Sequence, residues 1–430
     1  MDYLFFFWII GALVISFFKF KLGLDLYIFY WLFVPFMGYD LGLFTVKWST
    51  VCLLLLCAFL FYRMRKRKTN GIIIQPLFPF LLFFVILLLI MPFQKDVPFE
   101  FAFSGWKYQF IKFLILPFIL INFSINNKIL KHYRNLIMGC VLIIALYGFF
   151  LLFIPGSNPY ISAISSNMNT SFDLSYIEPG AGRLFGRISS VFLHPMTYGI
   201  FLCMSIIYVL YNRYYIQKYY YFLLPLLIIN ILLCGVRSVI AALLITTFFF
   251  FLQVRKFKII LYIVSISCLF ILILSFIPSL YSYVSSVFDI NNTKGSVGGS
   301  SLEMRLTQFA GCLLEIYDCI WFGKGFEWHH YYQSLYGDHP ILLAFESLIF
   351  MTLCDSGLCG VILWCSVFLY VVYNNNKFHG EKKIALNSFI ICYLSYSCIT
   401  GDYEYMQYFL LFYALTYISP ENNEIRKYGK

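Results

Sequence analysis

The run LLFFVILLLI at residues 81–90 contains only apolar side chains. Strands of a membrane barrel alternate apolar and polar residues, and this run does not alternate. It is typical of a helix inside the hydrocarbon core of a bilayer, which about 20 mostly apolar residues can cross. We therefore predict a membrane-spanning helix around it, at residues 72–93.

Similar apolar runs recur along the whole chain. Of its 430 residues, 61% are hydrophobic and 12% are charged, whereas soluble domains carry about 25% charged residues. This composition excludes a soluble domain and predicts an all-α polytopic membrane helix bundle, with residues 1–430 as a single integral membrane domain of about 12–14 transmembrane helices. The predicted spans are 3–20, 25–40, 44–62, 72–93, 105–124, 135–154, 191–211, 221–234, 237–253, 259–277, 343–373, 384–400 and 404–419.

The basic residues predict the orientation of the bundle. The segment RMRKRK at residues 63–68 lies between two predicted spans, and taking it as cytoplasmic places most of the 31 Lys and Arg residues on the same side. This distribution follows the positive-inside rule. The formal net charge of +11 is therefore explained by topology and by contact with anionic lipid head groups, and we expect no nucleic-acid partner.

Two long loops lie on the opposite, outer side of the predicted bundle. The first covers residues 155–190 and the second covers residues 277–340. Loops of this length usually carry function or are disordered. Between Met304 and Phe322 the apolar residues recur at helical spacing, which predicts an amphipathic helix on the membrane surface. We place the chemistry in the second loop because charged residues and histidines, rare elsewhere, gather there.

Three arginines share the predicted outer face. Arg187 precedes a His-Pro pair at the start of a span, Arg237 separates two spans, and Arg305 lies in the second loop. The guanidinium group binds phosphate oxygens in pairs and keeps its charge in a poor dielectric, so three converging arginines would bind a diphosphate. Alternatively, Arg237 snorkels at a helix end and Arg305 is a surface charge on the amphipathic helix.

His339 ends the second loop, between Asp338 and Pro340, directly before an apolar segment. Glu346 follows two helical turns later, on roughly the same face of the expected helix. A histidine beside an acid can act as a general base or orient a hydroxyl group. The alternative interpretation is a loop histidine that caps the helix, with Glu346 neutralising a buried arginine.

No metal site is expected. The 13 cysteines lie mostly within apolar runs, and neither a CxxC pair nor a Cys/His spacing suited to zinc occurs. His329 and His330 are weaker candidates for chemistry than His339. Gly357 and Gly360, in the sequence CDSGLCG, are expected to permit close helix packing.

The order of these motifs resembles the O-antigen polymerase and O-antigen ligase superfamily of bacterial envelope glycosyltransferases. The matching segments are GRLFGRISSVFLHPMTYG (182–199), LLCGVRSVIAALL (232–244), Arg305, IWFGKGF (320–326), His339 and DSGLCGVILW (355–364). The resemblance covers about residues 180–375, and the N-terminal half matches only in hydropathy. Two departures from the family pattern are Pro340, where Asn is usual, and Trp321, where Pro is usual.

The resemblance implies a metal-independent, cofactor-free glycosyltransferase, multi-pass in the bacterial inner (cytoplasmic) membrane. Such an enzyme takes a glycan from a polyprenyl-diphosphate-linked oligosaccharide at the periplasmic face and transfers it to an acceptor hydroxyl. It implies that Arg187, Arg237 and Arg305 bind the diphosphate and that His339 activates or orients the acceptor. Glu346 is an additional catalytic candidate from its position alone.

Within this family a polymerase elongates a lipid-linked repeat unit, and a ligase transfers the finished glycan to lipid A core. We favour an O-antigen or polysaccharide polymerase of lipopolysaccharide or capsule biosynthesis, since the departures suit the more divergent branch. Its partners would be the donor lipid, membrane lipid, a chain-length regulator and a flippase.

Two hypotheses from other classes stay open. A transporter or lipid-linked-glycan flippase would place its charges on many spans around a central cavity. A structural membrane subunit would lose only stability when Arg187 or His339 is substituted.

Overall fold

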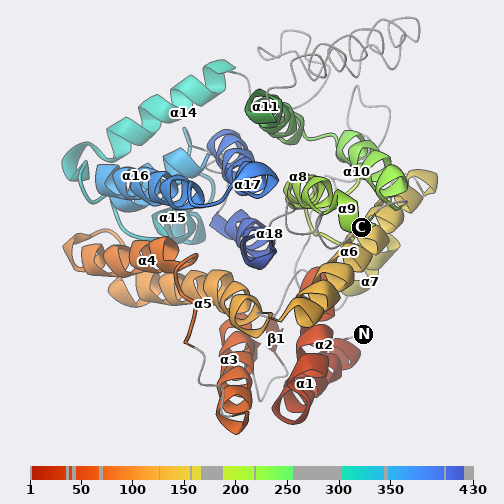
Figure 1. Ribbon diagram of the computed structural model, residues 1–430. Helices are drawn as coiled ribbons and strands as arrows, with labels where there is room; N and C mark the ends of the chain where they lie inside the picture. The colour runs from red at the N-terminus through yellow and green to blue at the C-terminus, as the bar shows by residue number, and fades with distance from the viewer. Residues whose placement is uncertain are drawn as a thin grey trace, which may run out of the picture.

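The computed structural model describes residues 2–34, 38–40, 45–66, 71–124, 126–154, 157–165, 187–216, 219–254, 302–342, 347–400 and 403–420 (Figure 1). Within these ranges the chain is helical apart from turns and one short hairpin, which confirms the all-α prediction. In chain order the elements are α1 (Asp2–Phe18), α2 (Phe20–Phe33), β1 (Gly38–Asp40), β2 (Thr45–Lys47), α3 (Trp48–Arg65), α4 (Phe78–Ile90), η1 (Met91–Phe93), α5 (Phe99–Phe123), α6 (Asn127–Phe150), η2 (Leu151–Phe153), α7 (Pro159–Ser165), α8 (Pro195–Tyr211), α9 (Arg213–Ile216), α10 (Tyr220–Cys234), α11 (Arg237–Val254), α14 (Leu302–Glu315), η5 (Tyr317–Cys319), α15 (Trp328–Tyr336), α16 (Leu348–Asn375), α17 (Gly380–Ile399), η6 (Tyr403–Tyr405) and α18 (Met406–Ile418).

The predicted spans coincide with helices, except for 259–277, which lies outside the described residues. Two predictions are wrong at one end. The span 44–62 begins later than expected, because Thr45–Lys47 is a strand and α3 begins at Trp48. The segment 25–40 was expected to be one helix, but α2 ends at Phe33, and Gly38–Asp40 pairs with Thr45–Lys47 in an antiparallel hairpin. The physical reason is Pro35, because a proline disfavours helical geometry in the residue before it, and Val34 is extended.

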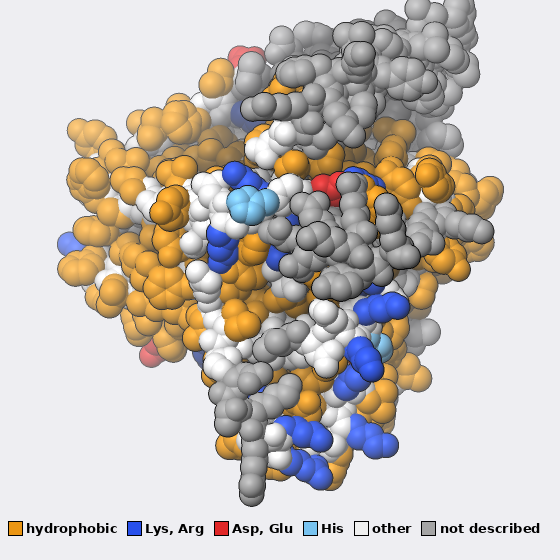
Figure 2. All heavy atoms as spheres, viewed as in Figure 1, with side chains coloured by type: hydrophobic (Ala, Val, Ile, Leu, Met, Phe, Trp, Pro, Cys, Tyr) orange, Lys and Arg blue, Asp and Glu red, His pale blue; other side chains and the backbone are white. Residues whose placement is uncertain are grey.

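Among the residues that the structure describes, three helices are long and apolar enough to cross a membrane: Phe99–Phe123, Asn127–Phe153 and Leu348–Asn375. Several shorter helices are also apolar, among them Pro195–Tyr211 and Tyr220–Cys234. Large apolar side chains are exposed on many of these helices, and hydrophobic side chains cover much of the rim of the molecule (Figure 2). A surface of this kind fits a hydrocarbon environment.

Helices α8, α17 and α18 lie at the centre of the molecule, with α4, α5 and α16 on one side and α6 and α10 on the other (Figure 1). Helix α17 packs against α8, α11, α16 and α18, and α18 also packs against α5. Aromatic rings fill the space between them. Phe201 of α8, for example, contacts Tyr408 and Phe412 of α18, with ring centroids 5.8 Å apart in both pairs.

Basic side chains gather at one end of the bundle. The start of α2 and the end of α3 meet there through Phe20 and Tyr62, whose rings stack 5.3 Å apart. His132 at the start of α6 bonds Asp25 at 2.9 Å, and Arg213 of α9 pairs with Glu381 at the start of α17. Lys and Arg side chains are visible on one face of the molecule in Figure 2, with few acidic neighbours. The described basic residues predicted to share one side of the membrane therefore do share one end of the bundle.

The predicted amphipathic helix exists but is shorter than expected. Helix α14 ends at Glu315 and is followed by the 3-10 turn η5. Its Leu306 and Phe309 are exposed while Gln308 and Cys312 are buried, an arrangement suited to a helix whose outer face contacts lipid. The chain leaves the helix because residues 320–325 turn inward to meet α16.

Helix α16 is broken at Gly357, whose φ of 61° and ψ of −157° are not helical. The loop at 320–325 enters this break and takes over the hydrogen bonds of the interrupted helix. Lys324 N–H donates to Cys354 O (2.8 Å) and Gly325 N–H to Asp355 O (3.2 Å), while Ile320 O and Trp321 O accept from the two residues after Gly357 (2.9 and 3.0 Å). The segments IWFGKGF (320–326) and DSGLCG (355–360) thus meet backbone to backbone, and we call this contact the junction.

The junction leaves no space for a side chain at either glycine. A Cβ on Gly357 would lie 2.6 Å from the nitrogen of Gly323, and a Cβ on Gly323 would lie 2.6 Å from the nitrogen of Gly357. Gly357 therefore permits close packing, but against a loop and not against a helix as expected. A Cβ on Gly360 would meet Ser356 and Thr352 of its own helix, so this glycine accommodates the break itself.

We predict that Gly357→Ala destabilises the protein by about 3 kcal/mol or more, because backbone atoms must move apart and four hydrogen bonds are disturbed. Gly337→Ala is the matched control. Gly337 has nearly the same backbone conformation, with φ 77° and ψ −154°, but no atom within 4 Å of its would-be Cβ, so we expect only the cost of backbone strain, about 1–3 kcal/mol, and a smaller loss than for Gly357→Ala. Thermal unfolding of the purified protein in detergent measures both, and equal losses would refute the account of the junction.

Candidate functional site

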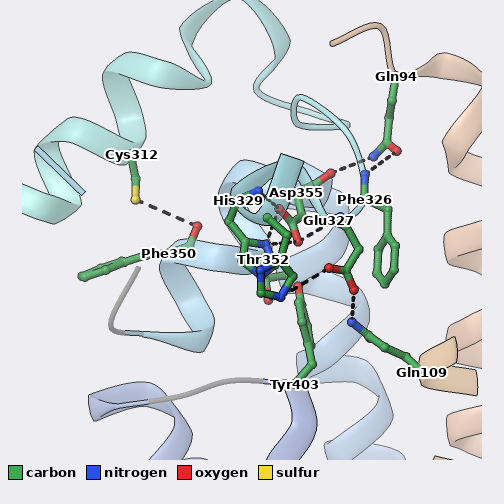
Figure 3. Close-up of polar contacts among 11 residues, drawn as sticks. Gln94, Gln109, Cys312, Phe326, Glu327, His329, Phe350, Thr352, Asp355 and Tyr403 are labelled. Carbon is green, nitrogen blue, oxygen red and sulfur yellow. Dashed lines mark hydrogen bonds and ion pairs between the residues drawn. The ribbon is translucent and has the colours of Figure 1, made fainter. Parts of the chain in front are cut away.

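Asp355 lies in the turn of α16 directly before the break and is fully buried. Its carboxylate accepts hydrogen bonds from the backbone N–H groups of Glu327 and His329, both at 3.3 Å. The ring of His329 places Nδ1 3.0 and 3.1 Å from the two carboxylate oxygens. Asp355 therefore caps the start of α15 and orients the His329 ring (Figure 3).

Glu327 precedes α15 with a φ of 64°, an uncommon conformation for a residue other than glycine. Its buried side chain accepts a hydrogen bond from Gln109 of α5, and its second oxygen, Oε2, lies 3.5 Å from His330 Nε2. A side chain at position 105 would collide with it, since a Cβ there would lie 2.4 Å from Glu327 Cγ. Residues held in strained conformations often belong to functional sites.

The start of α18 adjoins this group. Thr352 Oγ1 and the Tyr403 hydroxyl are 3.2 Å apart, and the rings of Tyr403 and His329 are 6.3 Å apart. Next to Tyr403, Glu404 forms an ion pair with Lys112 of α5 at 2.7 Å. We call Gln109, Glu327, His329, His330, Asp355 and Tyr403 the His329 cluster.

The His329 cluster contains a set of groups that could hold a metal ion. Ligand atoms of Glu327, His329 and His330 all lie within 4.8 Å of one another. From the sequence, the two histidines are weaker candidates than His339 and no metal site is expected. The adjacent His-His pair was a signal in the sequence, but nothing there showed that Asp355 and Gln109 reach it from other helices.

His339 is buried, and both ring nitrogens are engaged. Nδ1 accepts from the backbone N–H groups of Ile341 and Leu342 at 3.1 and 3.0 Å, and Nε2 lies 3.2 Å from Glu315 Oε1. Glu315 also pairs with Lys324 at 2.9 Å. Burial raises the pKa of Glu315, but the bonds from Lys324 and His339 outweigh it and hold the pKa below its ordinary value.

This geometry favours the interpretation of His339 as a capping residue of the loop. For a reaction with an acceptor, the ring would first have to leave Glu315. The second catalytic candidate, Glu346, lies outside the described residues. The pairing of His339 with Glu346 therefore stays a prediction.

Arg187 and Arg237 flank the turn between α10 and α11. Directly after Arg187, Ile188 N–H donates to Leu233 O in the last turn of α10, at 3.3 Å. Gly235 ends α10 in a left-handed conformation, with φ 64°, and Arg237 opens α11. The two arginines thus approach the same turn from different segments of the chain.

Arg305 reaches the same end of the bundle from α14. Its guanidinium donates to the carbonyl of Ile399, the last residue of α17. One turn earlier in α17, the Tyr396 hydroxyl donates to Met196 O at the start of α8, at 3.1 Å. All three predicted arginines therefore lie around the start of α8, the α10–α11 turn and the end of α17, away from the basic end.

His194 belongs to this arginine-bearing end. Its ring is the N-cap of α8, where Nδ1 accepts from Met196 N–H at 3.1 Å. Burial, and then the nearby Arg187 guanidinium, lower the pKa of His194 to about 4. A neutral ring keeps the lone pair on Nδ1 that the cap requires.

Fold and site together define an all-helical protein with helices able to cross a membrane, three arginines at one end, and the buried His329 cluster beside the α17–α18 connection. Comparison with models of known protein families gives no match, and comparison with curated proteins gives no relative.

We predict that His194 makes the protein sensitive to acid. Its folded pKa, about 4, is below the ordinary value of 6.5, so the unfolded chain binds the proton more tightly, and stability is lost as the pH falls from about 6.5 to about 4. His194→Asn keeps a capping acceptor but cannot titrate, so its melting temperature should fall less than wild type between about pH 7 and about pH 4.5. His194→Ala, which cannot titrate either, should be less stable than His194→Asn by about 1 kcal/mol at both pH values, because it lacks the cap. An identical acid response in wild type and His194→Asn would contradict the assignment.

Proposed function

We propose that the chain is a multi-pass glycosyltransferase of the bacterial inner membrane, with about 12–14 membrane-spanning helices. It transfers a glycan repeat unit from polyprenyl diphosphate to an acceptor sugar hydroxyl at the periplasmic face, as an O-antigen or polysaccharide polymerase. The observation that carries the proposal is the placement of Arg187, Arg237 and Arg305 at one end of the bundle, opposite the basic end.

This placement suits a lipid diphosphate. A polyprenyl tail lies in the bilayer and presents its diphosphate at the membrane boundary, where helix ends lie. The diphosphate is the leaving group, and its negative charge grows as the glycosidic bond breaks. Guanidinium groups held at helix ends stabilise that charge without first having to reorganise.

A buried amide next to Arg305 supports a polar ligand at this end. Gln308 lies one helical turn further along α14, on the same face as Arg305. Its side chain is fully buried, and neither of its polar atoms bonds to a described residue. Burying an amide without a partner is costly, so a polar group of the substrate beside α14 would offset this cost.

In this proposal the contacts of His339 favour a positioning role. The His339 ring, at the end of the second loop, contacts Glu315. Glu315 in turn pairs with Lys324, which lies beside the α16 junction. His339 would then hold the loop that carries the acceptor, and Glu346 remains a proposed catalytic group.

A transporter or flippase is a second candidate, favoured by one observation. Lys112 is nearly buried in α5, a helix apolar enough to span a membrane, and pairs with Glu404. Ionisable groups inside a membrane often mark transport pathways. A flippase would leave repeat units on the cytoplasmic side when inactive, whereas a polymerase would leave single repeats on the periplasmic side.

The test is the banding pattern of surface glycan in a host strain that lacks this chain, complemented at matched expression. We expect Arg187→Ala and Arg305→Ala to reduce polymerisation by on the order of 100-fold each, because each removes a charge that stabilises the leaving group. Lysine in place of either arginine should restore part of the activity, since it keeps the charge and loses the paired hydrogen bonds.

Arg65→Gln, in the last turn of α3 at the basic end, is the matched control and should leave the ladder unchanged. Single-repeat products with the arginine variants support the polymerase. Long carrier-linked glycan would identify a ligase instead. A normal ladder with Arg187→Ala and Arg305→Ala would contradict the proposed site.

A further inference from the structure

Two imidazole rings and one carboxylate meet at the start of α15. Glu327 and His329 are buried and His330 is partly exposed, and their ligand atoms lie within 4.8 Å of one another. The rings of the two histidines are 4.0 Å apart. Groups placed this close together either share a proton or bind a cation. The surrounding contacts distinguish these two possibilities.

The ring of His329 is fixed by a carboxylate. Nδ1 lies 3.0 and 3.1 Å from the oxygens of Asp355, so Nδ1 carries the hydrogen and Nε2 carries the lone pair. Metal-binding histidines commonly donate their second nitrogen to a carboxylate in this way, which orients the ring and makes it a stronger ligand. Asp355 is itself held by two backbone N–H groups, so the orienting group is rigid.

The two carboxylate oxygens of Glu327 contact different partners. One oxygen accepts from Gln109 of α5, and the other, Oε2, lies 3.5 Å from His330 Nε2. Bonds of about 2.0–2.1 Å to a tetrahedral zinc ion place ligand atoms about 3.3 Å apart. The spacing of Glu327 Oε2 and His330 Nε2 is thus already close to that of two zinc ligands.

We propose that Glu327, His329 and His330 bind a divalent transition-metal ion of the zinc type, with Asp355 and Gln109 as the outer groups that orient the ligands. Two imidazoles and one carboxylate suit zinc, whereas magnesium and calcium prefer oxygen ligands alone. Three protein ligands leave a fourth position for water or another oxygen ligand.

The proposed ion would join three helices. Its ligands open α15, Gln109 belongs to α5, and Asp355 borders the break in α16. The arginines of the proposed function do not contribute to the metal site. The metal site therefore goes beyond that function and is tested independently of it.

The test uses full-length, tag-free protein in detergent, treated with a chelator and then titrated with Zn²⁺ in competition with a chromophoric indicator. We expect one Zn²⁺ per chain. His330→Asn and Glu327→Gln should each weaken Zn²⁺ affinity by about 100-fold or more, since outer-group substitutions alone typically cost about 10- to 100-fold. Both changes preserve size, and Glu327→Gln can still accept from Gln109.

His132→Asn is the matched control, because His132 also pairs with an aspartate, Asp25, but lies at the basic end. It should bind Zn²⁺ as wild type does. Melting temperatures of the metal-free proteins show whether each variant is folded, and Co²⁺ in place of Zn²⁺ should give the visible absorption of a tetrahedral site. Less than one Zn²⁺ per chain in wild type, or unchanged affinity in folded His330→Asn and Glu327→Gln, would overturn the proposal.

Discussion

The junction between the loop at 320–325 and the break in α16 is the constraint on which the rest of the site depends. Backbone groups of a helix interrupted at Gly357 must find partners, because unpaired polar groups in an apolar bundle are costly. The loop supplies them, and Gln94 binds both sides of the junction by donating to Phe322 O and Asp355 O at 2.7 and 2.8 Å. The junction thereby fixes Asp355, and Asp355 fixes the start of α15.

Charge is sorted between the two ends of the bundle. One end carries most of the described lysines and arginines, where pairs such as Arg213 with Glu381 join neighbouring helices. The other end carries Arg187, Arg237 and Arg305, each at the start of a helix or next to the end of one. The proposed glycosyltransferase and the proposed metal site both use this second end, but through different residues. The proposed lipid diphosphate chemistry would use the arginines, and the His329 cluster organises the elements beside them.

The helices could be predicted from the sequence because their apolar runs are continuous. The end of α2 was predicted wrongly, because the apolar run continues past Pro35 and the effect of this proline was not taken into account. The arginines could be named as candidates because charged residues are rare in this chain. The His329 cluster was missed for a physical reason. Gln109 and Glu327 are 218 positions apart and His329 and Asp355 are 26 apart, and only the break in α16 brings these residues together. Contacts between residues so far apart cannot be inferred from their spacing in the sequence. His339 was the stronger candidate in the sequence because Asp338 and Pro340 flank it directly before an apolar segment.

Hydrogen exchange of the backbone amides tests the central claim most directly. In full-length protein in detergent, the amides of Lys324, Leu358 and Cys359 should exchange slowly, because each donates across the junction at 2.8–3.0 Å. The amide of Asp338, in the exposed turn after α15, provides the comparison on the same chain. Slow exchange in wild type that becomes fast in Gly357→Ala is the predicted result. Fast exchange of all three amides in the folded wild-type protein would show that the loop does not fill the break, and the account of the site would fail.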